Sequence, residues 1–484
     1  MNVLLARVFA AALSLSAGTT IAATLFVATD GDDSNAGTEA KPWKTLHKAA
    51  ASVQPGDIVR IKAGEYPVAP TWTVRQPGTA ESPITYQGYG GAVRITGSSI
   101  VPPDAWKLVK GAIYAAEVSE RVLSVFRNDL PLHDPGDGAK IFSVEEMIPN
   151  SFFKSGTTLH VWLDDGSEPK NSVMRIAPDH VISLRDCHHT IFDGLTVEFG
   201  FNGFKDQAAT HHITIRNCTI RSIASQGIQP VAKNCLIERN VFQKIGTNKY
   251  QHGIYGSEPG TIIRGNVFEE IAGAGIHQYN QDHPAGGGCE FSGNVFRKPR
   301  RMTVRSGPAS GSYYTDIIAW GEGGNLICNN VHLGEGKRSA VSLNSTNNRV
   351  FHNTFLDCTS AIGFHAGKPG NRVMNNLVLN AGKFIIWPKN SLPQTLDYNL
   401  YHNATEPPRW EHDGITHRTF SDYQKAAGEA HSLSVNPRHA AGARLQVGSP
   451  IIDAGTALSD VPADFNGVAR PQGTAPDIGA YEFR

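Results

Sequence analysis

Apolar residues recur in short alternating runs from about residue 180 onward. The runs read TIFDGLTV, ITIRNCTI, CLIERNVF, TIIRGNVF, CEFSGNVF, LICNNVHL, RVFHNTFL, RVMNNLVL and TLDYNLY. Aligned by their apolar positions, they place at one shared position Leu195, Cys218, Asn240, Asn266, Asn294, Asn330, Asn353, Asn376 and Asn399. The successive spacings are 23, 22, 26, 28, 36, 23, 23 and 23 residues. This period indicates a solenoid, and each unit is too short for a helical hairpin.

The repeating units are predicted to be strands. Their apolar residues alternate over a few positions and are mostly β-branched or aromatic, and no sustained helical stripe appears. Seven of the nine aligned positions hold asparagine. Parallel in-register stacking lets such side chains hydrogen-bond from coil to coil and satisfy backbone groups at a turn. A general preference of asparagine for turns explains one or two of the seven but hardly all of them.

A second phrase follows each aligned position: NGFKDQ, QGIQPV, HGIYGS, AGIHQY, DIIAWG, SAVSLN, SAIGFH and KFIIWP. It predicts a further strand in each coil with one inward aliphatic or aromatic side chain, namely Phe204, Ile228, Ile254, Ile276, Ile318, Val341, Ile362 and Ile385. Side chains alternate between the faces of a strand, so the neighbours of these residues should face outward together. Coils stacked about 4.8 Å apart would align those neighbours along a groove.

The six cysteines are predicted to be buried free thiols. Cys235 and Cys289 share an aligned position but lie two coils apart, roughly 9 to 10 Å, which is beyond disulfide reach. No two cysteines occupy the same position in adjacent coils.

The fold class that follows is all-β, a right-handed single-stranded parallel β-helix with an N-terminal capping helix. In TLHKAAASVQPGDIVRIKAGEY, Leu46, Ala49, Ala50 and Val53 share one helical face ahead of a Pro-Gly turn and a strand, and such a helix would cover the open end of the solenoid. The chain is divided into a signal peptide (1–23), an N-terminal cap with the first coils (24–100), an inserted hairpin excursion (101–178), regular coils (179–402) and a C-terminal segment packed on the solenoid (403–484).

Composition and charge narrow the location and the partners. Residues 1–23 combine Arg7, a short apolar stretch and small residues near Ala22 and Ala23, which is typical of a secretory signal peptide. No segment is long and apolar enough to span a bilayer, so we expect a secreted or periplasmic protein without a membrane span. The 44 basic and 44 acidic residues balance, which gives no electrostatic argument for nucleic acid as a partner. We expect a monomer.

Two segments bear a resemblance to a known family. FVATDGDDSNAGTEAKPWKTLHKAAASVQPGDIVRIKAGEY resembles the opening of the secreted pectate-lyase-like β-helix superfamily, and SPIIDAGT with PDIGAYEF is similar to a C-terminal segment common in its members. With the coils, the resemblance covers nearly the whole mature chain. It implies the fold and a polysaccharide partner, but not the reaction, because this superfamily includes lyases, epimerases and glycoside hydrolases.

The candidate site lies in three consecutive longer coils. RKPRRMTVRSGPASGSYYTD precedes one second-phrase strand and NQDHPAGGG follows another, so that two insertions border the predicted groove. The outward positions between them are His252, Tyr255, His277 and Tyr279, which we predict to be catalytic. The hypothesis is proton abstraction beside the carboxylate of a uronic acid, with His277 or His252 as base and Tyr255 or Tyr279 as acid. A sugar-stacking platform of the same residues is the simpler interpretation.

We expect the substrate to be an acidic polysaccharide. The residues predicted to bind it are Lys205, Gln229, Arg297, Arg300, Arg301, Arg305, Asp316, Glu322 and His365. The calcium-dependent pectate lyases that the chain resembles carry clustered aspartates beside a catalytic lysine or arginine. Here Asp206 and Asp316 are far apart, so no Ca²⁺ cluster can be mapped. Ca²⁺ stays open as a cofactor without an aspartate cluster to support it, and no metal ligand or other cofactor is identified. Lys205 is a possible lyase-type base by its outward position.

Two other functions stay open. A glycoside hydrolase would use a carboxylate pair drawn from Glu258, Asp282 and Glu322, at the ends of successive strands. A carbohydrate-binding solenoid without catalysis would need only the aromatic groove.

Overall fold

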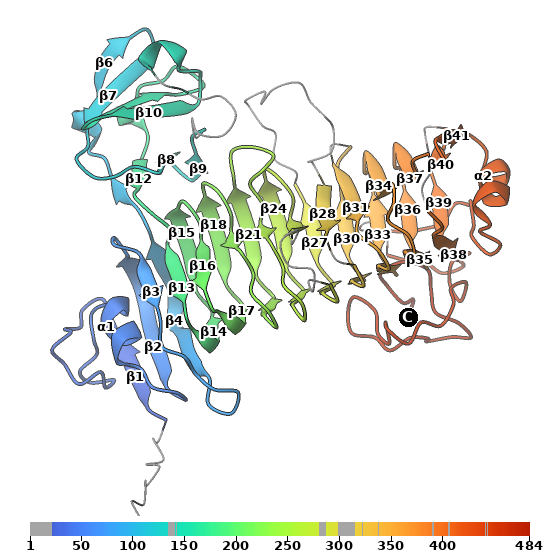
Figure 1. Cartoon of the computed structure of the whole chain (residues 1–484), viewed down its shortest axis with the longest axis horizontal. Coiled ribbons are helices and arrows are strands. Elements are labelled where there is room, and N and C mark those ends of the chain that lie inside the picture. Colours follow the sequence, from blue (N-terminus) through green and yellow to red (C-terminus); the bar gives the residue numbers. More distant parts are fainter. Residues whose placement is uncertain are drawn as a thin grey trace, which may run out of the picture.

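The computed structural model describes residues 22–133, 141, 143–279, 287–298, 315–321, 323–336, 338–389, 392–404, 407–440, 442 and 444–484. Most of the chain winds into an elongated parallel β-helix, with coils succeeding one another along the long axis of the molecule (Figure 1). Each regular coil contributes three short strands, and equivalent strands of successive coils pair in parallel. The fold class is therefore confirmed.

The strands form three stacks. The first stack contains β14 (His188–Asp193), β17 (His211–Arg216), β20 (Leu236–Glu238), β23 (Ile262–Arg264), β26 (Glu290–Ser292), β29 (Leu326–Cys328), β32 (Arg349–Phe351), β35 (Arg372–Met374) and β38 (Thr395–Asp397). The second stack contains β15 (Thr196–Gly200), β18 (Thr219–Ile223), β21 (Val241–Ile245), β24 (Val267–Ile271), β27 (Val295–Arg297), β30 (Val331–Leu333), β33 (Thr354–Leu356), β36 (Leu377–Leu379) and β39 (Leu400–His402). The third stack contains β3 (Trp72–Val74), β13 (Ile182–Arg185), β16 (Phe204–Ala208), β19 (Ile228–Gln229), β22 (Ile254–Tyr255), β25 (Ile276–Tyr279), β28 (Thr315–Trp320), β31 (Ser339–Asn344), β34 (Ser360–Phe364), β37 (Lys383–Ile386) and β40 (Trp410–His412).

The two ends of the helix are covered. At the N-terminal end, β1 (Thr24–Val27) and the long strands β2 (Ile58–Pro67) and β4 (Ile84–Thr96) form the first coils, and β2 and β4 join the first two stacks into one sheet. Helix α1 (Leu46–Ser52), capped by the Thr45 side chain, buries Leu46, Ala49 and Ala50 against these coils. At the other end lie β41 (Ile415–His417), antiparallel to β40, and helix α2 (Phe420–Ala427), whose Tyr423 stacks on Trp410.

An excursion between β4 and β13 builds two small antiparallel sheets with a core of their own, and it projects from the N-terminal part of the helix (Figure 1). One sheet contains β6 (Lys107–Lys110), β7 (Ile113–Glu117), β10 (Ser151–Ser155) and β11 (Thr158–Trp162), and the other β5 (Ser99–Ile100), β8 (Ser124–Arg127), β9 (Leu130–Pro131) and β12 (Met174–Ala177). Three short 3-10 helices accompany them: η1 (Pro103–Ala105), η2 (Val144–Glu146) and η3 (Pro169–Asn171).

The C-terminal segment lies along the flank of the last coils (Figure 1). It contributes Ile451 and Ile478 to an apolar cluster with Leu377, Leu379 and Leu400 of the second stack. Within the described residues, no helix is both long and apolar enough to cross a membrane.

The predicted asparagine ladder is present at the turn between the first and second stacks. From Asn240 to Asn376, each backbone N–H donates to the side-chain oxygen of the asparagine one coil further on, at 2.9 to 3.0 Å. The side-chain amides also satisfy buried carbonyls, as when Asn294 donates to Ile263. A second ladder, of Asn325, Asn348 and Asn371, lies at the turn into the first stack, and sequence alignment had missed it.

The inward positions of the third stack agree with the prediction in seven of eight coils. Phe204, Ile228, Ile254 and Ile276 pair in one register, and so do Val341, Ile362 and Ile385. In the coil between these two groups, the residue in register with Ile276 and Val341 is Ile317, so the assignment of Ile318 was wrong by one position. The sequence could not separate these adjacent isoleucines, and a slip of one residue exchanges the two faces of a strand.

All six cysteines are buried and free. Burial raises the pKa of the thiols of Cys187, Cys218, Cys235, Cys289 and Cys328 to about 12, which keeps them protonated and unreactive.

Candidate functional site

One row of side chains runs along the outer face of the third stack. Each member follows the inward residue of its strand and therefore faces the opposite way. The register of the paired strands places in this outer row Thr73, Ser183, Lys205, Gln229, Tyr255, His277, Ile318, Ser342, Gly363, Ile386 and Glu411. Four of the predicted site residues, Lys205, Gln229, Tyr255 and His277, thus occupy four successive coils.

An aromatic cluster forms the centre of this row. The rings of Tyr255 and Tyr279 stack with centroids 5.7 Å apart, and both lie edge to face against His277, at 5.3 and 5.8 Å. Trp320, which pairs with Tyr279 in the next coil, packs 5.7 Å from it. Sequence analysis missed Trp320 because the one-residue error in β28 placed it on the wrong face. The structure brings Tyr255, His277 and Tyr279 together as expected.

His252 lies behind this cluster instead of facing outward. Its side chain is 1% exposed, and it occupies the corner just before β22, so the expectation that it faces solvent was wrong. Alternation holds only inside a strand, and His252 precedes the strand by two residues. Its ring stacks on Tyr255 at 5.4 Å, and its backbone N–H donates to the Gln226 side chain.

The contacts of His252 determine the proton positions on both histidines. Its Nδ1 accepts the backbone N–H of Ala274 at 2.8 Å, so the proton of the neutral ring must lie on Nε2. His252 Nε2 lies 3.0 Å from Nδ1 of His277, so Nδ1 of His277 accepts this hydrogen bond. His277 consequently carries its own proton on Nε2, an atom that is buried and has no hydrogen-bond partner in the described structure.

Both histidines are held neutral. Burial lowers the pKa of His277 to about 4, and burial, followed by repulsion from His277 and Arg338, lowers that of His252 well below its usual range. Burial, followed by the nearby Tyr279, raises the pKa of Tyr255. At neutral pH the cluster therefore presents two uncharged donors, the Tyr255 hydroxyl and the His277 Nε2–H.

Lys205 supplies a basic group to the same outer row, in contrast to these neutral donors. It lies two coils from Tyr255 in the outer row, and Gln229 separates them. Burial lowers the pKa of the Lys205 ammonium, which the neighbouring Asp206 only partly offsets. The Gln229 side-chain oxygen accepts a hydrogen bond from Asn202 at 3.3 Å, which holds this amide in place.

Asp316 is buried and does not line the groove, contrary to expectation. It is the second residue of β28, at a position that holds glycine in preceding coils, among them Gly275, where an added Cβ would lie 2.5 Å from the Phe296 ring. The Asp316 carboxylate pairs instead with Arg338 at 2.9 Å and with His332 Nδ1 at 3.0 Å, and all three side chains are at most 6% exposed. Because its oxygens are committed to these partners, Asp316 has a structural role.

The remaining predicted binders are dispersed. Arg297 ends β27 in the second stack and pairs with Glu269 at 2.5 Å, so it is not free to bind an anion as expected. His365 follows β34, three coils beyond His277, and contacts the Ser342 hydroxyl of the outer row at 3.0 Å. Arg300, Arg301, Arg305, Glu322 and Asp282 lie outside the described residues.

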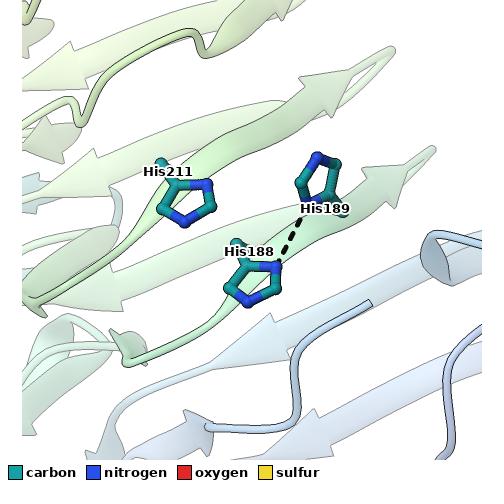
Figure 2. A group of neighbouring side chains, drawn as sticks. All are labelled: His188, His189 and His211. Carbon is teal, nitrogen blue, oxygen red and sulfur yellow. Dashed lines mark hydrogen bonds between the residues drawn. The ribbon is translucent and has the colours of Figure 1, made fainter. Parts of the chain in front are cut away.

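One group of potential metal ligands converges among the described residues, and it consists of His188, His189 and His211 (Figure 2). Sequence analysis had predicted no metal ligand and missed these residues, although the doublets at 188–189 and 211–212 repeat at the coil period of 23. Among all the residues that the structure describes, no cluster of carboxylates suited to Ca²⁺ converges.

Three family models match parts of the chain, and two of the matches overlap. The model of the right-handed beta helix region matches residues 159–302, that of the periplasmic copper-binding protein NosD matches 287–392, and that of a protein of unknown function, DUF1565, matches 29–72. In the described part of 287–392, no three histidine, cysteine or acidic side chains converge as copper ligands would. The converging histidines lie outside that match.

One curated protein shares a short segment with the chain. The uncharacterized protein YwoF of Bacillus subtilis (strain 168) is 38% identical over 77 residues, which is 16% of this chain and 16% of that protein.

Solved structures match over much more of the chain. Pectate lyase Pel9A aligns with 96% of this chain and 98% of its own at a TM-score of 0.57 and 16% identity. The complex of XylC with xylose aligns with 95% and 98% at a TM-score of 0.57 and 12% identity, and a glycoside hydrolase with 84% and 99% at 0.51 and 13%. Identities this low establish the fold alone, and this chain is a right-handed parallel β-helix protein whose architecture resembles that of pectate lyase Pel9A.

Proposed function

We propose that this protein is a polysaccharide lyase that cleaves an acidic, uronate-containing polymer by β-elimination along the outer row of the third stack. The observation that carries the proposal is the succession of Lys205, Gln229, Tyr255 and His277 in four consecutive coils on one face. It supplies a basic group, a polar spacer and a neutral donor in a line, with the buried His277 ring in the next coil. Similarity to pectate lyase Pel9A and to a glycoside hydrolase supports a carbohydrate substrate but not the reaction.

The base in this mechanism is Lys205. The lone pair of an amine is available only in the neutral form, which the lowered pKa of Lys205 favours. Neither histidine meets the same requirement. His277 offers a bound proton at Nε2, and both nitrogens of His252 are engaged. This assignment replaces His277 and His252 as the proposed base.

The acid is Tyr255, whose raised pKa keeps the phenol protonated. Two coil steps separate the backbones of Lys205 and Tyr255 by roughly 10 Å, which leaves room for one sugar ring over Gln229. Lys205 removes the proton from the carbon that bears the carboxylate, and the electron pair forms a double bond to the adjacent carbon. The bond from that carbon to the glycosidic oxygen breaks, and Tyr255 protonates this oxygen. Solvent then restores both groups.

His277 supports the site from within, because its Nε2–H is buried and its ring packs edge to face against Tyr255 and Tyr279. The faces of Tyr279 and Trp320 beside it provide stacking surfaces for the neighbouring sugar. We propose that the enzyme acts outside the cytoplasm as an exported monomer, on the basis of the pattern of residues 1–23.

A glycoside hydrolase would require two carboxylates at the groove. Within the described part of the outer row, the one carboxylate is Glu411, at the far end and paired with Lys383 at 2.8 Å.

The test is to incubate the mature protein with a panel of polyuronates and to record both ultraviolet absorbance and reducing ends. A lyase produces both signals, because each cleavage leaves an unsaturated uronate. Reducing ends without absorbance would identify a hydrolase. Solvent deuterium in the sugar without cleavage would identify an epimerase, and binding alone would indicate a non-catalytic solenoid.

A further inference from the structure

Four histidines gather on two adjacent coils at the start of the first stack. The doublets His188–His189 and His211–His212 begin β14 and β17, which pair in parallel with His188 opposite His211. In the neighbouring coil on the C-terminal side, Lys233 is opposite His211, so the arrangement is confined to two coils. This cluster belongs to a different sheet from the outer row, and the proposed lyase mechanism does not use it.

Backbone conformation explains how consecutive side chains meet. In a regular strand, His188 and His189 would point to opposite faces. His189 and His212 instead have positive φ angles of 51° and 52°, which interrupts the alternation in both coils. As a result the Nδ1 atoms of His188 and His189 lie 3.0 Å apart, and those of His211 and His212 lie 2.8 Å apart.

Stacking between the coils completes the cluster. The ring centroids of His188 and His211 are 4.6 Å apart, as are those of His189 and His212, with nearly parallel planes in both pairs. Figure 2 shows His188 and His211 side by side on neighbouring strands, with His189 next to them. One ligand atom from each of these three residues lies within 4.8 Å of the others.

The cluster is also accessible to solvent. His188, His189 and His211 are partly exposed, and no protein hydrogen bond in the described structure engages the Nε2 atom of any of the four.

We propose that His188, His189 and His211, with His212 beside them, bind one divalent transition metal ion of borderline softness, Cu²⁺ or Zn²⁺. A set of imidazole nitrogens selects this class over Mg²⁺ and Ca²⁺, which prefer oxygen ligands. Nitrogen–metal bonds of about 2.0 to 2.1 Å place two ligands of a tetrahedral ion roughly 3.3 Å apart, close to the separation within each doublet. Small rotations of the rings would therefore complete the site.

A metal at this position would link two coils. Because its ligands come from β14 and β17, binding would stabilise the pairing of these strands in the folded state but not in the unfolded chain. The ion is thus expected to raise the midpoint of thermal unfolding.

The experiment is titration of the chelator-treated, full-length mature protein with Cu²⁺ or Zn²⁺ alone, followed by calorimetry, with electron paramagnetic resonance of the Cu²⁺ form. The expected result is one site per chain with nitrogen hyperfine structure, a rise in the unfolding midpoint, and no binding of Mg²⁺.

Two variants test the assignment. The double substitution His188→Gln and His211→Gln removes one ligand from each coil, and His189→Asn removes a third while keeping a residue that tolerates positive φ. Each variant should bind the ion at least about tenfold more weakly, whereas the His439→Gln variant, altered at a partly exposed histidine of the C-terminal segment, should bind it normally. Circular dichroism confirms that each variant is folded. Unchanged affinity in folded variants, or Cu²⁺ without nitrogen ligands, would overturn the proposal.

Discussion

His252 Nε2 and His277 Nδ1 lie 3.0 Å apart, and the hydrogen bond between them has a fixed direction, with His252 as donor and His277 as acceptor. The direction is set by the Ala274 backbone N–H, which occupies the other nitrogen of His252. A backbone donor cannot exchange roles, so the order extends to His277 and places its remaining proton on Nε2. His252 therefore fixes the orientation of the His277 ring, whose remaining N–H is a neutral donor.

Lys205→Arg is expected to lower kcat on a polyuronate by at least about 100-fold, because a guanidinium stays protonated and cannot accept a proton. The activity of the unaltered protein should rise with pH as neutral Lys205 is populated, along a limb that lies below the ordinary lysine pKa of 10.5. Initial rates of absorbance increase measure both effects. Lys62→Arg, at an exposed site, is the matched control. Full activity in Lys205→Arg would remove lysine as the base.

Tyr255→Phe should lower kcat by about 100-fold or more with little change in KM, because the ring still packs while the proton donor is lost. Tyr89→Phe, on β4 far from the site, is the control. A larger loss of kcat in Tyr279→Phe than in Tyr255→Phe would transfer the role of acid to Tyr279.

Stability should fall on acidification through the titration of His277. Its folded-state pKa of about 4 lies below the ordinary 6.5, so the unfolded chain binds the proton more readily between these values. The contribution is absent above pH 6.5 and reaches about 3 kcal/mol of lost stability as pH falls toward 4. Denaturant unfolding across this range should therefore give a flatter pH dependence for His277→Gln. Equal slopes for the two proteins would refute the predicted shift.

Asn294→Ala is expected to destabilise the protein by about 2 to 4 kcal/mol. The substitution removes the acceptor of the Asn266 N–H and the donor to the Ile263 carbonyl in a position that is 0% exposed. Thermal and denaturant unfolding measure the loss. Asn436→Ala, at an exposed position, should change stability by less than about 0.5 kcal/mol. A similarly small effect at Asn294 would show that the ladder contributes little.

Arg338→Met should destabilise the protein by about 3 to 5 kcal/mol, because it leaves the buried Asp316 carboxylate without its strongest partner. It also removes donors to the carbonyls of Ile271 and Thr315. Arg349→Met, which breaks a partly exposed pair with Asp460, should cost no more than about 1 kcal/mol in the same unfolding assay. A comparable cost at both sites would exclude a special role for the buried pair.

The sequence by itself determined the winding of the chain. A period near 23, strand-like alternation and an asparagine in most coils specify stacked strands, because each coil repeats the same local environment. The same pattern brought Tyr255, His277 and Tyr279 to one region, since Tyr255 and His277 occupy equivalent positions in adjacent coils and Tyr279 lies two residues after His277 in the same strand. The grouping of the candidate site was therefore accessible without coordinates.

Only the tertiary structure decided which way several side chains face and what they contact. Two adjacent isoleucines, Ile317 and Ile318, fit either face of β28, and only pairing with the neighbouring coils selects Ile317 for the interior. His252 precedes its strand and Asp316 lies near the start of β28, and the contacts of both side chains come from other coils. Such contacts join residues about one coil or more apart in sequence, so local pattern cannot specify them.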